Sequence, residues 1–160
     1  MTGSEPVTRA ALEARALRHL ARREYARTEL RRLLLRSCAD QVLVDAVLDR
    51  LEAEGLLSDA RYAEARLRST RQRGFGPWRL RHDLQRAGAR VDDDALFGDT
   101  DWREVASLAL EKRFGSQAPT SPKDWGRRVR FLQARGFPGE IIAAVLRAHY
   151  GNHQPEFPAD

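Results

Sequence analysis

The chain has 160 residues, of which 28 are basic and 23 are acidic, and its formal net charge is +5. This length suits one ordinary domain or several small modules that share a continuous core. The sequence has no run of about 18 apolar residues and no basic-then-apolar start, so we expect neither a membrane span nor a signal peptide. Its single cysteine, Cys38, cannot form an internal disulfide. We therefore expect a soluble, cytoplasmic protein.

Apolar residues recur at helical spacing in nearly every segment, and almost no segment alternates with the period of a strand. In chain order the apolar stripes are Leu12–Ala21, Leu30–Leu34, Leu43–Leu51, Tyr62–Leu67, Leu80–Ala87, Val91–Leu96, Trp102–Leu110, Trp125–Leu132 and Ile141–Leu146. Three of the expected helices begin at typical N-cap or first-turn residues and end at glycines: Asp40 with Gly55, Ser58 with Gly74, and Pro77 with Gly88. The pattern predicts an all-α protein of about nine short helices.

The order of the expected helices repeats along the chain. A shift of 50 residues brings apolar positions of 17–34 onto those of 67–84, and a shift of 98 brings 34–48 onto 132–146. One such unit is too small to bury its own apolar face, so the units must stack into an elongated array. The alternative is one compact bundle whose similar spacings arise from the abundance of leucine. The predicted parts are a flexible N-terminus at 1–8, three-helix repeats at 9–57, 58–98 and 100–150, and a flexible tail at 151–160.

Charge follows the same order as the helices. Segment 61–90 carries nine arginines against Glu64 and Asp83, a balance of +7, whereas segment 92–111 carries one arginine against seven acids, a balance of −6. Some of this charge is expected to pair internally where acidic helices pack beside basic ones, and each exposed pair contributes only about 0–1 kcal/mol. The excess in the middle unit is larger than such pairing consumes, so we expect a basic surface there.

Several cations fall opposite the apolar stripes when residues are placed at helical spacing. Arg61 and Arg68 lie opposite the apolar face of their helix, and Trp78 points outward among arginines of the next one. An outward tryptophan favours stacking or partner contact, although covering the joint between two repeats is an equal alternative. For the cations the alternative is a solvated face. Arg128 falls nearer the apolar side, where we expect it to pair with an acid or to extend its head to water.

Catalytic and metal-binding arrangements are not indicated. His149 and His153 are four residues apart, but Gly151 lies between them at a helix end, so a metal site is not expected. The residues Asp92–Asp94 are consecutive and therefore point in different directions on a helix. Cys38 has no histidine nearby in the sequence, and no glycine-rich phosphate loop follows a strand. We expect no enzyme activity, no metal and no cofactor.

Motifs occur in all three expected repeats: LARREY at 20–25, LSDARYA at 57–63, GFGP at 74–77 and FLQARGF at 131–137. Their order and spacing resemble the RecX family, the regulators of the RecA recombinase. One departure is Ala26, which stands where relatives tend to have a serine cap. Alanine cannot accept the free N–H groups of a helix start, and Glu29 is left without its reciprocal partner.

Resemblance to RecX implies a non-enzymatic regulator that lies in the helical groove of the RecA filament on single-stranded DNA. It would bridge adjacent subunits and restrain recombinase and ATPase activity in DNA repair, and we expect it to act as a monomer. Arginines would clamp carboxylates or phosphates, and Trp78 would supply contact area. The predicted binding residues are Arg61, Arg68, Arg71, Trp78, Arg79 and Arg86 of the middle unit, assisted by Lys123, Arg127 and Arg130.

Two other functions stay open at this point. One is a helical protein that binds DNA non-specifically and acts without a recombinase. Its binding to single strands would be tight and would weaken steeply as salt rises. The other is a structural adaptor that recognises an acidic protein and ignores nucleic acid.

Overall fold

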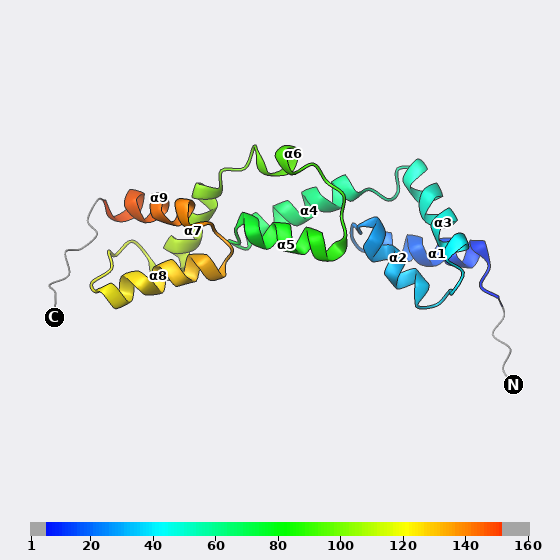
Figure 1. Ribbon diagram of the computed structural model, residues 1–160, viewed down its shortest axis with the longest axis horizontal. Coiled ribbons are helices and arrows are strands. Elements are labelled where there is room, and N and C mark those ends of the chain that lie inside the picture. Colours follow the sequence, from blue (N-terminus) through cyan, green and yellow to red (C-terminus); the bar gives the residue numbers. More distant parts are fainter. Residues whose placement is uncertain (1–5, 152–160) are drawn as a thin grey trace, which may run out of the picture. The chain divides into compact units, whose positions relative to one another are not determined.

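The structure is a computed structural model that describes residues 6–151. Within these residues every regular element is an α-helix, as Figure 1 shows, and no helix is both long and apolar enough to cross a bilayer. The predicted all-α class is confirmed. The predicted flexible ends fall mostly outside the described residues. The helices are α1 (Arg9–Leu20), α2 (Arg27–Leu35), α3 (Gln41–Ala53), α4 (Asp59–Gln72), α5 (Pro77–Ala87), α6 (Asp93–Phe97), α7 (Trp102–Phe114), α8 (Pro122–Ala134) and α9 (Gly139–Tyr150).

The predicted helix borders are present in the structure. Asp40 accepts a hydrogen bond from the Leu43 N–H at 3.0 Å, and Ser58 accepts one from the Arg61 N–H at 3.2 Å. Gly55 follows α3 with a φ of 71°, a left-handed conformation that favours glycine. Local sequence is therefore enough to set where these helices begin and end.

The chain forms two compact units. The first comprises the chain up to Ala65 together with Leu84–Asp92, and the second comprises Arg66–Asp83 together with the chain from Asp93 onward. The division falls inside α4 and α5, so each of these helices contributes residues to both units. The three repeat boundaries stay a prediction.

In the first unit α1, α2 and α3 pack around one hydrophobic core. The stripe of α1 is narrower than predicted, because Leu12 and Ala16 are buried whereas Leu17 is 38% exposed. Positions four apart share a helix face, but Leu17 is turned from Leu12 by about 140°. The other fully buried members follow the predicted stripes: Leu30, Leu34, Val44, Leu48 and Leu51.

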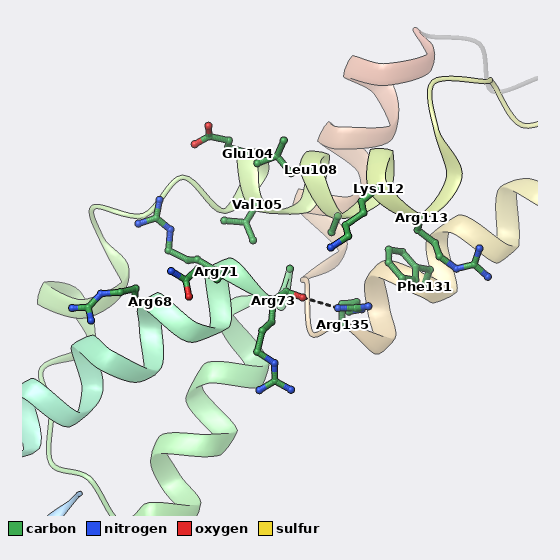
Figure 2. Close-up of a pocket in the computed structure, with 13 residues that line it drawn as sticks. Arg68, Arg71, Arg73, Glu104, Val105, Leu108, Lys112, Arg113, Phe131 and Arg135 are labelled. Carbon is green, nitrogen blue, oxygen red and sulfur yellow. Dashed lines mark hydrogen bonds between the residues drawn. The ribbon is translucent and has the colours of Figure 1, made fainter. Parts of the chain in front are cut away.

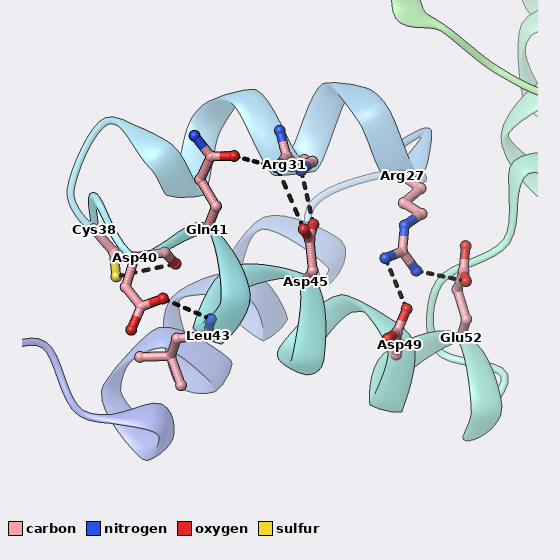
Figure 3. Close-up of polar contacts among 9 residues, drawn as sticks. All are labelled: Arg27, Arg31, Cys38, Asp40, Gln41, Leu43, Asp45, Asp49 and Glu52. Carbon is pink, nitrogen blue, oxygen red and sulfur yellow. Dashed lines mark hydrogen bonds and ion pairs between the residues drawn. The ribbon is translucent and has the colours of Figure 1, made fainter.

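Ion pairs join the basic helix α2 to the acidic helix α3 (Figure 3). Arg27 pairs with Asp49 and with Glu52, each at 2.7 Å, and Arg31 Nε donates to Asp45 at 2.7 Å. The hydrogen bond from Arg31 holds the pKa of the Asp45 carboxyl below its ordinary value. Pairing of acidic with basic helices, as predicted, therefore consumes part of the positive charge of the first repeat.

The N-terminus of α2 is capped by a residue of α4. Ala26 precedes α2 and offers no side-chain acceptor. Asp59, the first residue of α4, accepts the Arg27 N–H through one carboxylate oxygen and the Arg90 N–H through the other, both at 2.8 Å. One carboxylate thus satisfies two backbone donors that are 63 residues apart in the chain.

Two further contacts complete this end of α2. The backbone of Gly88, after α5, lies so close to Thr28 that a Cβ at position 88 would be 2.8 Å from the Thr28 Cβ. Glu29, expected to lack its reciprocal partner, pairs with Arg23 at 2.6 Å. Asp59 thus supplies the acceptor that Ala26 lacks, and Arg23 supplies a partner for Glu29.

The second unit is built on α7, α8 and α9, which Figure 1 shows lying together. Its buried side chains include Ala106, Leu110, Leu132, Phe137, Val145 and Leu146. All but Phe137 come from the predicted stripes. Phe137 is fully buried and belongs to the turn between α8 and α9, so that turn is anchored in the core.

The N-terminus of α5 is closed by backbone groups of the same turn. The Gly76 N–H donates to the Arg135 carbonyl at 2.8 Å, and the Trp78 N–H donates to the Gly136 carbonyl at 3.1 Å. A Cβ at position 76 would collide with the Gly136 carbonyl and would lie 2.7 Å from the Phe137 nitrogen. Glycine is required here because two backbones approach closely.

We expect Asp59→Ala to lower the free energy of unfolding by about 1–3 kcal/mol, because two backbone donors lose their acceptor. The matched control is Asp49→Ala. It also removes one negative charge from a partner of Arg27, but an exposed one that binds the guanidinium, and should cost about 0–1 kcal/mol. Urea unfolding followed by circular dichroism measures both. Equal losses for the two variants would contradict the capping role of Asp59.

We expect Gly76→Ala to lower the free energy of unfolding by about 1–3 kcal/mol, because the added methyl group forces two backbones apart. Gly139→Ala is the control, since a Cβ at position 139 meets nothing within 4 Å and neither glycine has a left-handed φ. Alanine is the better helix former, so the control should be neutral or stabilised by up to about 1 kcal/mol. Thermal unfolding compares the pair, and a Gly76→Ala protein as stable as the control would show that the close approach is not required.

Candidate functional site

A pocket of about 670 Å³ lies in the second unit, bounded by the end of α4, one face of α7 and part of α8. Figure 2 shows Arg68 and Arg71 on one side of it and Lys112 and Arg113 on the other, with Val105 between them. This volume is within the range of about 300–1,000 Å³ that is usual for binding pockets. The pocket is therefore the candidate functional site.

The floor of the pocket is apolar and comes mainly from α7. Val105, Leu108 and Ala109 line it, together with Phe131 of α8. Positions three and four apart share a face of a helix, which brings the three α7 residues together. Gly74 at the end of α4 approaches this face so closely that a Cβ there would lie 3.2 Å from the Ala109 Cβ. Gly74 thus allows the end of α4, which forms one wall of the pocket, to pack against the α7 face that forms its floor.

Arg135 forms the wall beside α8. Its Nη1 donates to the Arg73 carbonyl at 2.8 Å, a contact drawn in Figure 2. Its guanidinium carbon lies 4.6 Å from the ring centroid of Phe75 and 5.1 Å from that of Phe131. Cation–π contacts of this kind hold the side chain in place. The turn after α8, whose carbonyls accept N–H groups at the start of α5, therefore also shapes the pocket.

The electrostatic character of the pocket is strongly positive. Six of its lining residues are cations and one, Glu104, is a carboxylate. Apart from Arg135, these cations form no ion pair or side-chain hydrogen bond with another described residue, although two stack on neighbouring phenylalanine rings. Unpaired cations around a partly enclosed surface attract anions more strongly than the same charges spread over a flat face. The cations are Arg68, Arg71, Arg73, Lys112, Arg113 and Arg135.

Two of the predicted site residues, Arg68 and Arg71, line the pocket together. Both are exposed, and both lie on α4 three residues apart, so they project from one face of the helix. The structure brings them close to Lys112 and Arg113, which are more than 40 residues away in the chain. Their role in binding stays a prediction.

Three other predicted residues lie away from this pocket. Arg61 belongs to the first unit and pairs with Glu24 at 3.1 Å. Arg79 lies 3.6 Å from Asp83 of the same helix, so part of its charge is compensated internally. Trp78 is 55% exposed, and its backbone N–H donates to the Gly136 carbonyl in the turn after α8. Arg61 and Arg79 are thus less available to a partner than Arg68 and Arg71.

The remaining predicted cations are all exposed. Arg86 lies in the first unit, where its carbonyl accepts a hydrogen bond from Arg32 at 2.8 Å and its side chain is left to solvent. The others, on α8, do not line the pocket, and they form no ion pair with a carboxylate in the described part of the chain: Lys123, Arg127 and Arg130.

Arg128 is the buried exception on α8, as its position near the apolar side predicted. It is 4% exposed and pairs with Asp124 at 3.3 Å. Its Nη1 also donates to the Gln117 carbonyl at 2.6 Å and to the Tyr150 hydroxyl at 2.5 Å. This arginine holds the loop before α8 and the end of α9, and so has a structural role.

Four cations of the pocket were not among the predicted site residues: Arg73, Lys112, Arg113 and Arg135. Two signals point to them. Arg135 belongs to the FLQARGF motif, and Leu108 is 59% exposed because it lies off the inward face that Val105, Ala106, Ala109 and Leu110 of its helix share. Neither signal predicts from the sequence that arginines at the ends of α4 and α8 lie in the same pocket as Leu108.

The described residues contain no group of three or more histidine, cysteine or acidic side chains that could hold a metal ion. His149 instead shares a hydrogen bond with Ser107, which joins α9 to α7. His153 lies outside the described residues. Within the pocket the available chemistry is that of guanidinium and ammonium groups, which bind carboxylates or phosphates, beside an apolar surface.

Comparison with known solved structures supports the fold. The crystal structure of RecX from Lactobacillus salivarius aligns with a TM-score of 0.75 and 21% identity, over 88% of this chain and 95% of that one. A second structure, of a regulatory protein RecX, aligns with a TM-score of 0.68 and 22% identity, over 86% and 72% of the two chains. At these identities the likeness concerns the fold alone.

Sequence relatives carry the comparison further. A regulatory protein RecX of Acidithiobacillus ferrooxidans is 47% identical over 112 residues, which are 70% of this chain and 71% of the relative. One of Pseudomonas putida is 41% identical over 101 residues, which are 61% and 65%. Residues 58–90 match the model of the second three-helix domain of RecX, and residues 99–146 match that of the third. The chain, with its tandem three-helix domains, therefore belongs to the RecX family.

Proposed function

We propose that this chain is a non-enzymatic regulator that binds the filament of the RecA recombinase on single-stranded DNA and restrains its recombinase and ATPase activity. It would act in the cytoplasm, as a monomer, during DNA repair and recombination. Family membership supports this proposal, because the relatives are named regulatory proteins. The repeat boundaries predicted at 57 and 98 belong to the same proposal.

The observation that carries the proposal is the set of uncompensated cations on α4 and α7. Arg68 and Arg71 form no ion pair with a carboxylate in the described part of the chain, and they lie beside Lys112 and Arg113 at one pocket. A cation that is paired internally must give up its partner before it binds another, whereas these need not. Guanidinium groups form paired hydrogen bonds with carboxylates and with phosphates, and a recombinase filament on DNA presents both.

The other predicted residues contribute to partner binding to different extents in this proposal. Arg86, Lys123, Arg127 and Arg130 are exposed and available to phosphates or carboxylates, and Trp78 offers contact area. Arg61 and Arg79 contribute less, because Glu24 and Asp83 already compensate part of their charge.

The test is inhibition of RecA ATPase on single-stranded DNA by a variant that carries Arg68→Glu and Arg71→Glu. We expect the concentration for half-inhibition to rise about tenfold or more, because two attractive contacts become repulsive. The control carries Arg15→Glu and Arg18→Glu on α1. These residues are also exposed and three apart, so the control has the same change in net charge at a place outside the proposed surface.

Co-sedimentation with RecA filaments and with bare single-stranded DNA at the same salt accompanies the assay. Equal loss of inhibition in the two variants would show that net charge matters and that the pocket does not. Wild-type chain that sediments equally with bare DNA, weakens steeply with salt and leaves ATPase unchanged would instead support the non-specific DNA-binding function.

A further inference from the structure

We infer that the pocket of the second unit receives an acidic segment of a protein partner, and that this segment inserts one aliphatic side chain against Leu108. The inference rests on the proposed function, since it states which kind of surface on the protein component of the filament this site recognises. The juxtaposition that carries it is an exposed leucine in a pocket lined by six cations, none of which has an acidic partner in the described part of the chain.

Charge selects an anionic occupant. The lining holds six cations against one carboxylate, which leaves the pocket with five uncompensated positive charges. Figure 2 shows Glu104 at the upper edge of the pocket, while the cations occupy its sides. A single carboxylate at the edge cannot neutralise six cations. The occupant must therefore bring several negative charges, and this excludes a neutral or basic peptide.

The apolar floor selects an occupant that is not only anionic. Leu108 is 59% exposed, and Ala109 and Phe131 are half-buried beside it. Covering an exposed leucine with an aliphatic side chain stabilises a complex by roughly 25 cal/mol for each Å² of apolar surface removed from water. A chain of charges alone would leave this surface wet. An acidic segment with one apolar anchor satisfies both features.

The aromatic rings of the site favour a peptide over a nucleic acid. A base would need an open ring face on which to stack. Phe131 has the Arg135 guanidinium carbon 5.1 Å from its centroid, and its centroid lies 5.4 Å from that of the Phe114 ring, which is nearly perpendicular to it. Phe75 has the guanidinium carbons of Arg73, Arg79 and Arg135 within 5.0 Å of its centroid. The exposed Trp78 does not line the pocket, so bases find no free platform there.

The dimensions agree with a short extended segment. Val105, Leu108 and Lys112 follow one face of α7, and seven residues of helix rise by about 10 Å. An extended peptide advances roughly 3.3 Å for each residue, so about three of its residues lie along this face. With the aliphatic side chain at Leu108, acidic residues on either side reach Lys112 in one direction and Arg71 in the other.

The test uses the full chain and fluorescence anisotropy at physiological ionic strength, without RecA or DNA. The first probe is a labelled nine-residue peptide with leucine at its centre and four acidic residues on each side. The second has serine in place of the leucine. The third is a labelled oligothymidylate of the same charge. We expect the leucine peptide to bind at least about fivefold more tightly than the serine peptide, and the oligothymidylate not to displace it.

Leu108→Ser should remove the difference between the two peptides, because the apolar contact is gone while every charge remains. Leu56→Ser is the matched control, since Leu56 is also exposed, at 43%, and lies in the first unit. It should preserve the full difference. Circular dichroism checks that both variants remain folded, and the exposure of both leucines favours this outcome.

Three results would overturn the inference: equal binding of the leucine and serine peptides, displacement of the leucine peptide by oligothymidylate, or the same loss in both leucine variants. Inhibition of RecA ATPase, measured on the same wild-type preparation, separates this failure from that of the proposed function. Intact inhibition with no preference for the leucine peptide rejects the acidic anchor alone, whereas absent inhibition rejects the regulatory function itself.

Discussion

Two helix starts of this protein, those of α2 and α5, depend on acceptors supplied by other segments. The first N–H groups of an α-helix have no partner inside the helix and must find one elsewhere. The start of α2 has alanine and that of α5 has glycine at the position where a capping side chain usually stands. Asp59 of α4 serves α2, and the carbonyls of Arg135 and Gly136 serve α5. Each helix start therefore becomes a joint between segments far apart in the chain.

The joint at α5 also builds the candidate site. It places the turn after α8 against Gly76, and that turn carries Arg135, which stacks on Phe75 and Phe131 at the edge of the pocket. The close approach of Gly74 to Ala109 brings the end of α4 to the apolar face of α7. Cations of α4, of α7 and of the turns after α4 and α8 then line one pocket together with the exposed Leu108. The backbone contacts that satisfy the start of α5 thus help to bring together cations that no single helix carries.

Pairing divides the many arginines into three classes. Those of α2 pair with carboxylates of α3, and the exposed pairs contribute little stability each while consuming positive charge. Arg128 is buried and holds a loop and a helix end together. The arginines around Leu108 belong to neither group, because no carboxylate in the described chain meets them. It is this third class that suits a binding surface, since contact with a partner costs no internal pair.

The sequence by itself determined the helices, their borders and the family, because apolar period, cap residues and glycines act over a few neighbouring residues. It also predicted that Arg68 lies opposite the apolar face of its helix and that Arg128 falls nearer the apolar side. Only the tertiary structure decided which arginines are compensated by a carboxylate and which lie together in one pocket. Glu24 pairs with Arg61, 37 residues away in the chain, and Arg135 donates to the Arg73 carbonyl, 62 residues away. These contacts depend on how the helices pack, and a local sequence pattern does not encode which distant residues come into contact.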